Sequence, residues 1–421
     1  MQTLRCEVLI LGAGPAGLAA ALAAASCGRQ TIVLDDNPRP GGQIWRDGPQ
    51  VALPPLARRY REAVAAAENI TLLSGARLIA RPTARSVMFE TAEACGIVEW
   101  QKLILCCGAR ELSLPFPGWT LPGVTAAGGL QAQIKHGLAL KGGERVVVAG
   151  SGPLLLAVAD TVKKSGGEIV QIVEQAPLSA LVRFGSRLWR WPEKLRQLAS
   201  LAPRRYLSDS RIIHAHGKTR LEAVTLRQRG VERTLACDRL AIGYGLVPSL
   251  ESALFFGCAV ADEAVKVDCW QQTSVADVYA AGECTGFGGS ELALVEGEIA
   301  GFAAADAGDR AQALFARRAR WQDFADAVRR AFILPESLKT LATPESLLCR
   351  CEDVRCGEVA SAEGWQQAKL ALRCGMGACQ GKTCATTARW LYGWPLVAPR
   401  EPLSPARAET LIALAQESGE R

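Results

Sequence analysis

The chain has 421 residues, of which 49% are hydrophobic and 21% are charged. This composition is typical of a soluble globular protein, and the length predicts two to three domains. The net charge of +6 is spread over 48 basic and 42 acidic residues without a basic run, which argues against a nucleic-acid partner. The apolar stretch 6–25 is interrupted by three glycines and a proline. We therefore expect neither a signal peptide nor a transmembrane helix.

Two segments of the chain predict the same order of elements: a strand, a glycine turn, a helix and a second strand. The first segment spans residues 6–34 and the second spans residues 144–174. This order is typical of a Rossmann-like unit, so we expect an α/β protein with two dinucleotide-binding domains. A later apolar strand, ending in the Gly-Glu pair at 282–283, predicts that the chain returns to the first domain.

The first glycine turn, at residues 12–17, has the Gly-x-Gly-x-x-Gly spacing of a dinucleotide-binding loop. Its first glycine allows a sharp turn, its second lets a pyrophosphate approach the backbone, and its third lets helix and strand pack closely. An acidic residue at the end of the second strand is placed to accept hydrogen bonds from ribose hydroxyls. The residues predicted for this site are Gly12, Ala13, Gly14, Pro15, Ala16, Gly17, Asp35 and Asp36.

Three further segments favour FAD as the dinucleotide: the Pro-Gly-Gly-Gln turn at 40–43, the strand end at 107–110 and the Gly-Glu pair at 282–283. Here the sequence resembles the two-dinucleotide-domain flavoproteins, which include thioredoxin reductase and glutathione reductase. The resemblance implies that these segments contact FAD, although this chain has a glutamate where that family usually has an aspartate. The implied contacts are Gly42, Gln43, Cys107, Gly108, Ala109, Arg110, Gly282 and Glu283.

The cysteine pattern near the flavin motifs argues against disulfide reduction. The disulfide reductases of that family need a Cys-x-x-Cys or Cys-x4-Cys pair beside the flavin. Neither the vicinal Cys106 and Cys107 nor the single Cys284 provides such a pair. We interpret these three cysteines as apolar filler.

The second glycine turn departs from the dinucleotide-binding pattern. Gly150 and Gly152 keep the first two glycines, but Leu155 replaces the third. Glu174 ends the following strand, where an acid suits the ribose of NAD. The sequence therefore predicts a weakened NAD-type site, and a retained fold with an empty or repurposed site stays an equal alternative.

The cysteines near the end of the chain predict a metal centre. Of the 15 cysteines, nine are scattered between Cys6 and Cys284, and six lie between Cys349 and Cys384. Two close pairs separated by 27 residues can supply four thiolates, which suit zinc or a [2Fe–2S] cluster. The spacing resembles the bacterioferritin-associated-ferredoxin type of [2Fe–2S] module, and a neighbouring flavin favours the cluster over zinc. The predicted ligands are Cys349, Cys351, Cys379 and Cys384, with Cys356 and Cys374 as bystanders.

The whole chain resembles the large electron-transfer component (the α chain) of hetero-oligomeric bacterial amino-acid dehydrogenases. These include opine oxidases, hydrogen cyanide synthase, dye-linked proline dehydrogenase and D-hydroxyproline dehydrogenase. The Gly-Gly-Gln-Ile-Trp-Arg segment at 41–46, combined with the terminal cysteine module, carries the resemblance. It implies an oxidoreductase acting on CH–NH or CH–NH2 donors, such as D-hydroxyproline, an opine or glycine.

The resemblance also implies a division of labour between subunits. A separate FAD-containing, amino-acid-oxidase-like β subunit oxidises the substrate, and this chain, without catalytic residues of its own, relays electrons through FAD and a [2Fe–2S] cluster. The electrons leave to a quinone or another acceptor. Some members add an FMN at the subunit interface, a small ferredoxin-like γ subunit, or NAD or ATP in the second nucleotide site.

The predicted domains are an FAD-binding domain at 1–115 and 245–340, an NAD-type domain at 116–244, a [2Fe–2S] module at 341–400 and a closing helix and tail at 401–421. We expect a cytoplasmic protein, with peripheral attachment to the inner membrane left open. Two alternative functions remain: a stand-alone NAD(P)H-dependent flavin and iron–sulfur reductase, and a non-enzymatic scaffold with a structural zinc.

Overall fold

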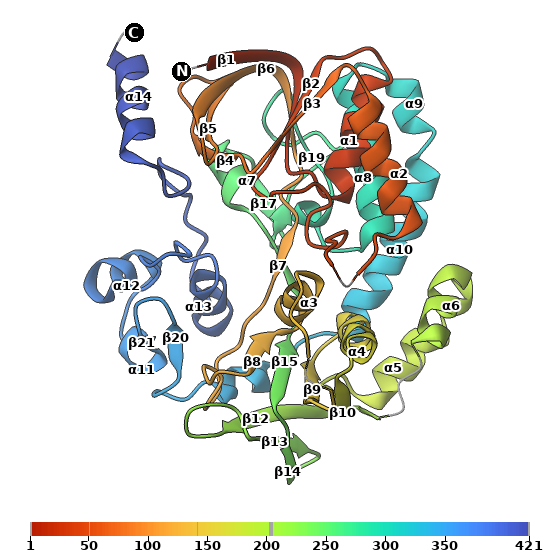
Figure 1. Ribbon diagram of the computed structural model, residues 1–421, viewed down its shortest axis with the longest axis vertical. Coiled ribbons are helices and arrows are strands. Elements are labelled where there is room, and N and C mark those ends of the chain that lie inside the picture. The colour runs from red at the N-terminus through yellow and green to blue at the C-terminus, as the bar shows by residue number, and fades with distance from the viewer. Residues whose placement is uncertain (1, 50, 141, 202–204, 420–421) are drawn as a thin grey trace.

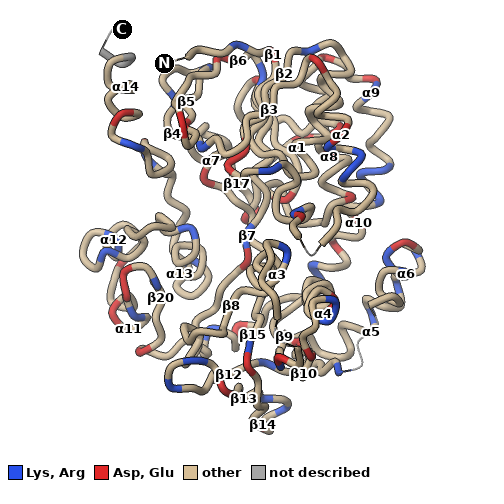
Figure 2. Tube along the Cα trace, in the orientation of Figure 1, with Lys and Arg blue, Asp and Glu red and all other residues tan. Residues whose placement is uncertain are grey.

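The computed structural model describes residues 2–49, 51–140, 142–201 and 205–419. Residues 1, 50, 141, 202–204, 420 and 421 of the predicted domains lie outside this part. Two α/β units lie one above the other, and a small cysteine-bearing module stands beside them (Figure 1). Basic and acidic residues are interspersed along both units (Figure 2). None of the helices in the described residues is long and apolar enough to cross a bilayer.

The first unit is built on a seven-stranded sheet with a parallel core. Its strand order is β3-β2-β1-β6-β5-β4, and β19 pairs with β6. All five residues of β2 are buried, as expected for a parallel strand that is covered on both faces. The strands are β1 (Gln2–Leu11), β2 (Thr31–Asp35), β3 (Ile70–Ser74), β4 (Arg77–Ala80), β5 (Ser86–Glu90), β6 (Cys95–Leu105) and β19 (Val278–Ala280).

Helices α1 (Pro15–Ala25) and α8 (Ser290–Ala304) pack closely against each other in this unit. A Cβ atom added to Gly297 would overlap the carbonyl oxygen of Ala16, and one added to Gly301 would overlap that of Ala20. The two glycines of α8 therefore let the two helix backbones approach. The other helices of the unit are α2 (Pro55–Ala66), α7 (Glu251–Phe255), η2 (Glu283–Thr285), α9 (Gly308–Gln312) and α10 (Phe315–Ala331).

The second unit repeats this plan on a five-stranded sheet of order β11-β10-β9-β15-β8. Its elements are β8 (Val124–Ala126), α3 (Ala127–Lys135), β9 (Arg145–Gly150), α4 (Leu154–Lys164), β10 (Glu168–Glu174), β11 (Tyr206–Leu207) and β15 (Arg239–Gly243), beside an antiparallel sheet of β12 (Ser210–His216), β13 (Ala223–Gln228) and β14 (Val231–Ala236). The predicted fold class, with two Rossmann-like domains and a small C-terminal helical module, is confirmed.

A helical insertion of the second unit docks onto the first. It consists of α5 (Leu178–Gly185), η1 (Leu188–Arg190) and α6 (Pro192–Ser200), and it follows β10. Trp191 is 2% exposed, donates from Nε1 to the carbonyl oxygen of Arg320 at 3.1 Å, and packs edge-on against Phe324. Lys194 forms an ion pair of 2.9 Å with Glu291 at the start of α8. The insertion therefore ties the two units together.

Strand β7 (Ala109–Glu111) pairs with β16 (Leu246–Pro248) where the chain passes between the units. Glu111 accepts a hydrogen bond from the N–H of Gly128 at 2.5 Å, but its second oxygen, Oε2, is buried without a partner in the described residues. Burial raises the pKa of Glu111 to about 7, against the opposing effect of the Gly128 N–H.

Glu111→Gln is expected to weaken the pH dependence of stability. In wild type the folded chain releases this proton only near pH 7, whereas the unfolded chain releases it near its ordinary value of 4.5, so stability falls as the pH rises through 7. Glutamine keeps the acceptor for Gly128 and removes the titration. Between pH 6 and pH 8 the free energy of unfolding in urea should fall by roughly 1 kcal/mol less than in wild type. Glu62→Gln, at an exposed position, is the control, and equal pH slopes for Glu111→Gln and wild type would refute the assignment.

The cysteine module is anchored to the second unit and ends in a tail that returns to the first. It comprises η3 (Glu336–Leu341), β20 (Leu347–Cys349), β21 (Val354–Arg355), α11 (Cys356–Val359), α12 (Trp365–Leu372) and α13 (Cys384–Tyr392). Trp119 Nε1 donates to the carbonyl oxygen of Leu347 at 2.9 Å, and Thr387 Oγ1 donates to that of Ser113 at 2.6 Å. Helix α14 (Ala408–Gly419) then lies beside β4 and β5, where Thr410 donates to Glu90. The short strands β17 (Val260–Ala261) and β18 (Ala264–Val265) form a separate hairpin.

Candidate functional site

The carboxyl ends of four parallel strands of the first sheet, β1, β2, β6 and β19, meet at one edge. In doubly wound folds, ligands bind in the crevice outside such an edge. The four predicted flavin segments follow these strands: the loop 12–17, the acids at 35–36, the strand end 107–110 and the pair 282–283. The structure therefore brings together segments that lie far apart in the chain.

The glycines of the first loop have different structural roles. Gly12 has a φ of +105°, and a Cβ there would overlap the carbonyl oxygen of Cys106. A Cβ on Gly17 would overlap the carbonyl oxygen of Gly12, so this glycine serves the packing of helix on strand. Gly14 differs, because an added Cβ would meet only the Cα of Gly42, at 4.0 Å. The open space of the loop therefore lies beside Gly14, between it and the turn at 40–43.

The turn at 40–43 is held directly against this loop. The N–H of Gly41 donates to the carbonyl oxygen of Ala13 at 2.7 Å, and a Cβ on Gly42 would come within 3.0 Å of the Cα of Gly14. Gln43 is exposed and accepts a hydrogen bond of 2.7 Å from Arg46. Two glycine-rich backbones thus face each other with little side-chain volume between them, as a phosphate-bearing ligand requires.

The two predicted acids after β2 are not equivalent. Asp35 is 4% exposed; its Oδ2 accepts from the N–H of Ala13 and its Oδ1 accepts from the N–H of Asn37 at 2.7 Å. Burial raises the pKa of Asp35, and these hydrogen bonds oppose the shift. Asp35 therefore holds the loop in shape, and the exposed Asp36 is the carboxylate available to a ribose.

The Gly-Glu pair after β19 lies against the first loop. Gly282 has a φ of +80°, its N–H donates to Glu296 Oε2 at 2.9 Å, and an added Cβ would come within 2.8 Å of the Cβ of Ala16. Burial raises the pKa of the Glu283 carboxyl to about 7, although a hydrogen bond from the N–H of Gly289 lowers it. A neutral carboxyl in this place can donate as well as accept a hydrogen bond.

The residues after β6 are engaged within the protein. Arg110 pairs with both oxygens of Glu251, at 2.6 and 2.5 Å, and also donates to the carbonyl oxygen of Lys382 at 2.9 Å. Gly108 accepts from the N–H of Ser249, and Ala109 pairs with Pro248 in the β7–β16 ladder. Arg110 therefore links the crevice to the cysteine loop 379–384, a role that its sequence position does not indicate.

The cysteines around the crevice are free and largely buried thiols. Burial raises the pKa of Cys107 to about 11 and raises those of Cys106 and Cys284 still further. Such thiols carry little thiolate at neutral pH, and thiolate is the reactive form. Their environment agrees with the interpretation of these residues as filler.

The structure corrects the role expected for Glu174 in the second loop. Glu174 is fully buried and accepts hydrogen bonds from the N–H of Gly152 at 2.8 Å, the N–H of Ala176 at 2.9 Å and the hydroxyl of Tyr206 at 3.2 Å. Its carboxylate therefore staples the loop and is not presented to a ribose. Gly150, at φ +133°, packs against the carbonyl oxygen of Gly243, and Leu155 is fully buried in the core of the unit.

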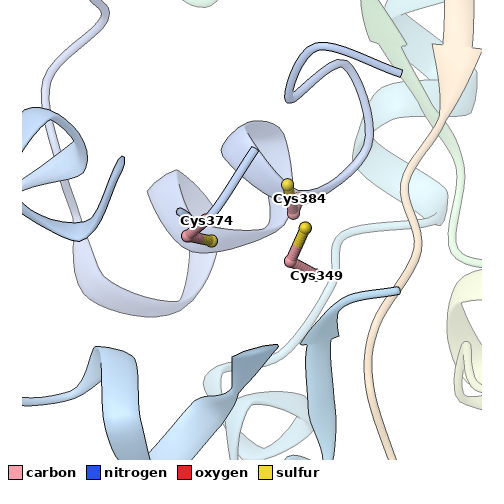
Figure 3. A group of neighbouring side chains, drawn as sticks. All are labelled: Cys349, Cys374 and Cys384. Atoms are coloured by element: carbon pink, nitrogen blue, oxygen red, sulfur yellow. The ribbon is translucent and has the colours of Figure 1, made fainter. Parts of the chain in front are cut away.

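The cysteines of the C-terminal module converge from three segments. The sulfurs of Cys349, Cys374 and Cys384 lie within 4.8 Å of one another and face each other (Figure 3). Cys349 ends β20 and Cys384 begins α13. The sulfurs of Cys351 and Cys379 are 3.8 Å apart. The proximity of Cys374 could not be foreseen, because no spacing rule relates it to the two pairs.

One cavity of about 350 Å³ distinguishes the predicted ligands from this neighbour. Cys349, Cys351, Cys379 and Cys384 all line it, whereas the fully buried Cys374 is not part of its wall. The N–H of Gly375 donates to Cys349 Sγ at 3.4 Å, and a Cβ on Gly377 would overlap that of Cys351. Four thiols around one cavity, with backbone N–H groups near the sulfurs, form a donor set that suits a tetrathiolate metal centre.

Comparisons with known proteins agree with this architecture. Residues 6–305 match the family described as pyridine nucleotide-disulphide oxidoreductase. The chain is 31% identical to the HcnB component of hydrogen cyanide synthase from Pseudomonas aeruginosa, over 94% of this chain and 96% of that protein. It is also 31% identical to the large component of opine oxidase from Agrobacterium tumefaciens, over 96% of this chain and 88% of that protein.

Two solved structures share the fold at lower identity. L-proline dehydrogenase from P. horikoshii gives a TM-score of 0.68 at 17% identity, covering 97% of this chain and 80% of that one. Thioredoxin reductase from Lactococcus lactis gives 0.54 at 18% identity, covering 72% and 99%. The family model spans both α/β units, and the curated relatives extend the match through the cysteine module. The chain is therefore an oxidoreductase of the pyridine nucleotide-disulphide oxidoreductase family, in the group that contains HcnB and the matching opine oxidase component.

Proposed function

We propose that this chain is the electron-transfer subunit of a multi-subunit, flavin-dependent amino- or imino-acid dehydrogenase, with FAD in the crevice of the first unit and a [2Fe–2S] cluster in the cysteine cavity. The observation that carries the proposal is the direct link between the two sites. Arg110 leaves the crevice on β7, pairs with Glu251 and donates to the carbonyl oxygen of Lys382, inside the loop that bears two of the four cysteines.

The crevice fits the pyrophosphate and ribose of FAD. The open space beside Gly14 and Gly42 gives a phosphate access to backbone, and the N-terminus of α1 faces that space. Asp36 is the free acid for a ribose, and the Gly282 and Glu283 pair closes the crevice from β19. When bound, a flavin accepts two electrons from a hydride donor and releases them one at a time to a one-electron centre.

The cysteine cavity fits a cluster with four thiolate ligands. Zinc with four cysteines uses the same donor set, so the metal itself has to be identified. We expect about two irons and two acid-labile sulfides per chain in anaerobically purified protein. Stoichiometric zinc without sulfide would instead support the scaffold alternative.

The substrate is assigned to a partner protein. The two curated relatives are both named as subunits of larger enzymes. The three histidines of the chain, His136, His214 and His216, all lie on elements of the second unit, away from the crevice. We therefore place oxidation of a D-hydroxyproline-, opine- or glycine-type C–N bond on an FAD-containing, amino-acid-oxidase-like β subunit. Co-purification would also reveal an interface FMN or a small ferredoxin-like third subunit, and the electrons pass on to a quinone or another acceptor.

NADH is expected to leave the flavin of the isolated chain oxidised. In the second unit Glu174 and the N–H of Gly152 are bonded to each other, so the loop offers little to a nicotinamide dinucleotide. Anaerobic stopped-flow mixing with NADH should show no bleaching near 450 nm, the usual absorption region of oxidised flavin, whereas dithionite should bleach it fully. Substrate should bleach it only after the β subunit is added. Prompt bleaching by NADH alone would support the stand-alone reductase.

A further inference from the structure

A second, larger cavity of about 590 Å³ lies between the two α/β units. Its walls come from α4, the α5–α6 insertion, α10 and α13 (Figure 1). Glu283 and Gly289 of the flavin crevice form part of it, and so do Arg389 and Trp390 of α13, the helix that begins at Cys384. A cavity of this size accepts a small organic ligand. It therefore touches both proposed redox sites.

The cavity also shares part of its wall with the cysteine cavity. Leu112 and Tyr244 line both of them. Tyr244 is 3% exposed, and its hydroxyl is buried without a hydrogen-bond partner among the residues that the structure describes. An unpaired buried hydroxyl costs free energy, which a ligand carrying an acceptor recovers.

The glycine loop at one end of this cavity is poorly suited to a pyrophosphate. The N–H of Gly152 donates to Glu174, that of Leu155 donates to the carbonyl oxygen of Gly152 at 3.2 Å, and that of Leu156 donates to the carbonyl oxygen of Pro153 at 3.2 Å. Pro153 itself has no N–H. Binding of a phosphate to a helix N-terminus needs these N–H groups to be free.

The positive charges of the cavity wall are already paired. Its basic side chains are Lys194, Arg329 and Arg389. Lys194 pairs with Glu291 at 2.9 Å, Arg389 pairs with Glu263 at 3.0 Å, and Arg329 pairs with Asp326. A dinucleotide or ATP would bring at least two negative charges to a wall whose described cations are all committed, which disfavours both ligands.

The remaining wall is apolar and aromatic. Phe184 comes from α5, Phe324 from α10 and Trp390 from α13, and leucines of α4 and α6 fill the gaps between them. Aromatic faces from three directions suit a flat, uncharged ring by stacking and edge contacts. Together with the free hydroxyl of Tyr244, they favour a planar ligand with a carbonyl acceptor.

We propose that this interdomain cavity binds a quinone, one carbonyl of which accepts a hydrogen bond from Tyr244. This inference rests on the proposed function and identifies where its electron acceptor binds. The balance is complete: oxidation of a C–N single bond to C=N releases two electrons and two protons. Reduction of a quinone to its quinol, in which both carbonyls become hydroxyls, takes up the same number. The site lies between the two proposed redox sites, within one shared wall of the cysteine cavity.

The test measures binding of decylubiquinone to the full-length chain by quenching of tryptophan fluorescence. Val328→Trp places a large ring at the cavity wall and is expected to raise the dissociation constant about tenfold or more. Gln322→Trp, on the exposed face of the same helix, is the matched control and should bind as wild type does. Tyr244→Phe removes only the hydroxyl and should weaken binding by about fivefold to tenfold without lowering the unfolding temperature.

Flavin and sulfide contents, measured first on each protein, separate the two proposals. A chain with full flavin and sulfide that does not bind decylubiquinone, or that binds it equally well as Val328→Trp, overturns the quinone site and leaves the proposed function standing. Displacement of decylubiquinone by NADH or ATP at micromolar concentration also overturns it. A colourless chain with zinc and no sulfide overturns the proposed function itself.

Discussion

Replacing Cys379 by serine is expected to abolish the iron–sulfur absorption of the purified chain and to leave its flavin content unchanged. Cys379 lines the cysteine cavity, and its sulfur lies 3.8 Å from that of Cys351. A serine hydroxyl is a much poorer ligand for iron than a thiolate, so three remaining thiolates should not retain the cluster. The module has its own hydrophobic core, separate from those of the first unit, and the flavin crevice should therefore persist. Visible absorption, acid-labile sulfide and extracted flavin measure both outcomes.

Two other cysteines of the same module provide controls for this experiment. Cys356 is 5% exposed but does not line the cavity, so Cys356→Ser should keep the cluster while introducing a similar buried hydroxyl. Cys374→Ser tests the neighbour whose sulfur lies within 4.8 Å of two predicted ligands. Loss of the cluster in Cys374→Ser but not in Cys379→Ser would replace one ligand by the other. Loss of flavin together with cluster in Cys379→Ser would mean that the module is not independent.

Gly14→Val is expected to yield a folded chain that has lost most of its flavin. The space beside Gly14 holds no protein atom closer than the Cα of Gly42, at 4.0 Å, so a valine fits the protein but fills the approach to the backbone. Its φ of −69° is also accessible to valine, so backbone strain is not introduced. The ratio of flavin to protein should drop at least about tenfold, which corresponds to about 1.4 kcal/mol of binding free energy or more.

The first loop and a distant turn contain the matched controls. Gly142→Val, at an exposed glycine with nothing within 4 Å, should keep its flavin. Gly17→Ala should instead destabilise the fold, because its Cβ would overlap the carbonyl oxygen of Gly12. Circular dichroism and thermal unfolding distinguish these two effects. A normal flavin content in Gly14→Val would contradict the assignment of the loop.

The fold could be predicted from the sequence because its main signals are local. A buried strand, a glycine turn and a helix follow one another within about thirty residues, as in other Rossmann units, and the chain repeats them from β9 to β10. The different roles of Gly12, Gly14 and Gly17 were also predictable, since each role follows from its place in the turn. The cysteine pairs pointed to a metal centre for the same reason: close spacing in the chain enforces proximity in space.

The features that could not be predicted depend on contacts between distant segments. Nothing near Arg110 in the chain indicates that it reaches Lys382, and nothing near Glu174 indicates that its carboxylate is consumed by its own loop. The α5–α6 insertion carries no motif, yet Trp191 fixes it against α10 and so creates a wall of the interdomain cavity. Cys374 joins two ligands only because α12 and its following turn bring it there.

The fastening of the cysteine module has a mechanical consequence for electron flow. Trp119 and Thr387 secure the module to the second unit, Arg110 secures its loop to the first, and α14 anchors the tail beside β5. Such a module cannot ferry charge by swinging between docking positions, as a tethered carrier does. The gap across which an electron must tunnel is set once, when the chain folds. Solvent viscosity should therefore leave the rate of transfer within this protein unaffected.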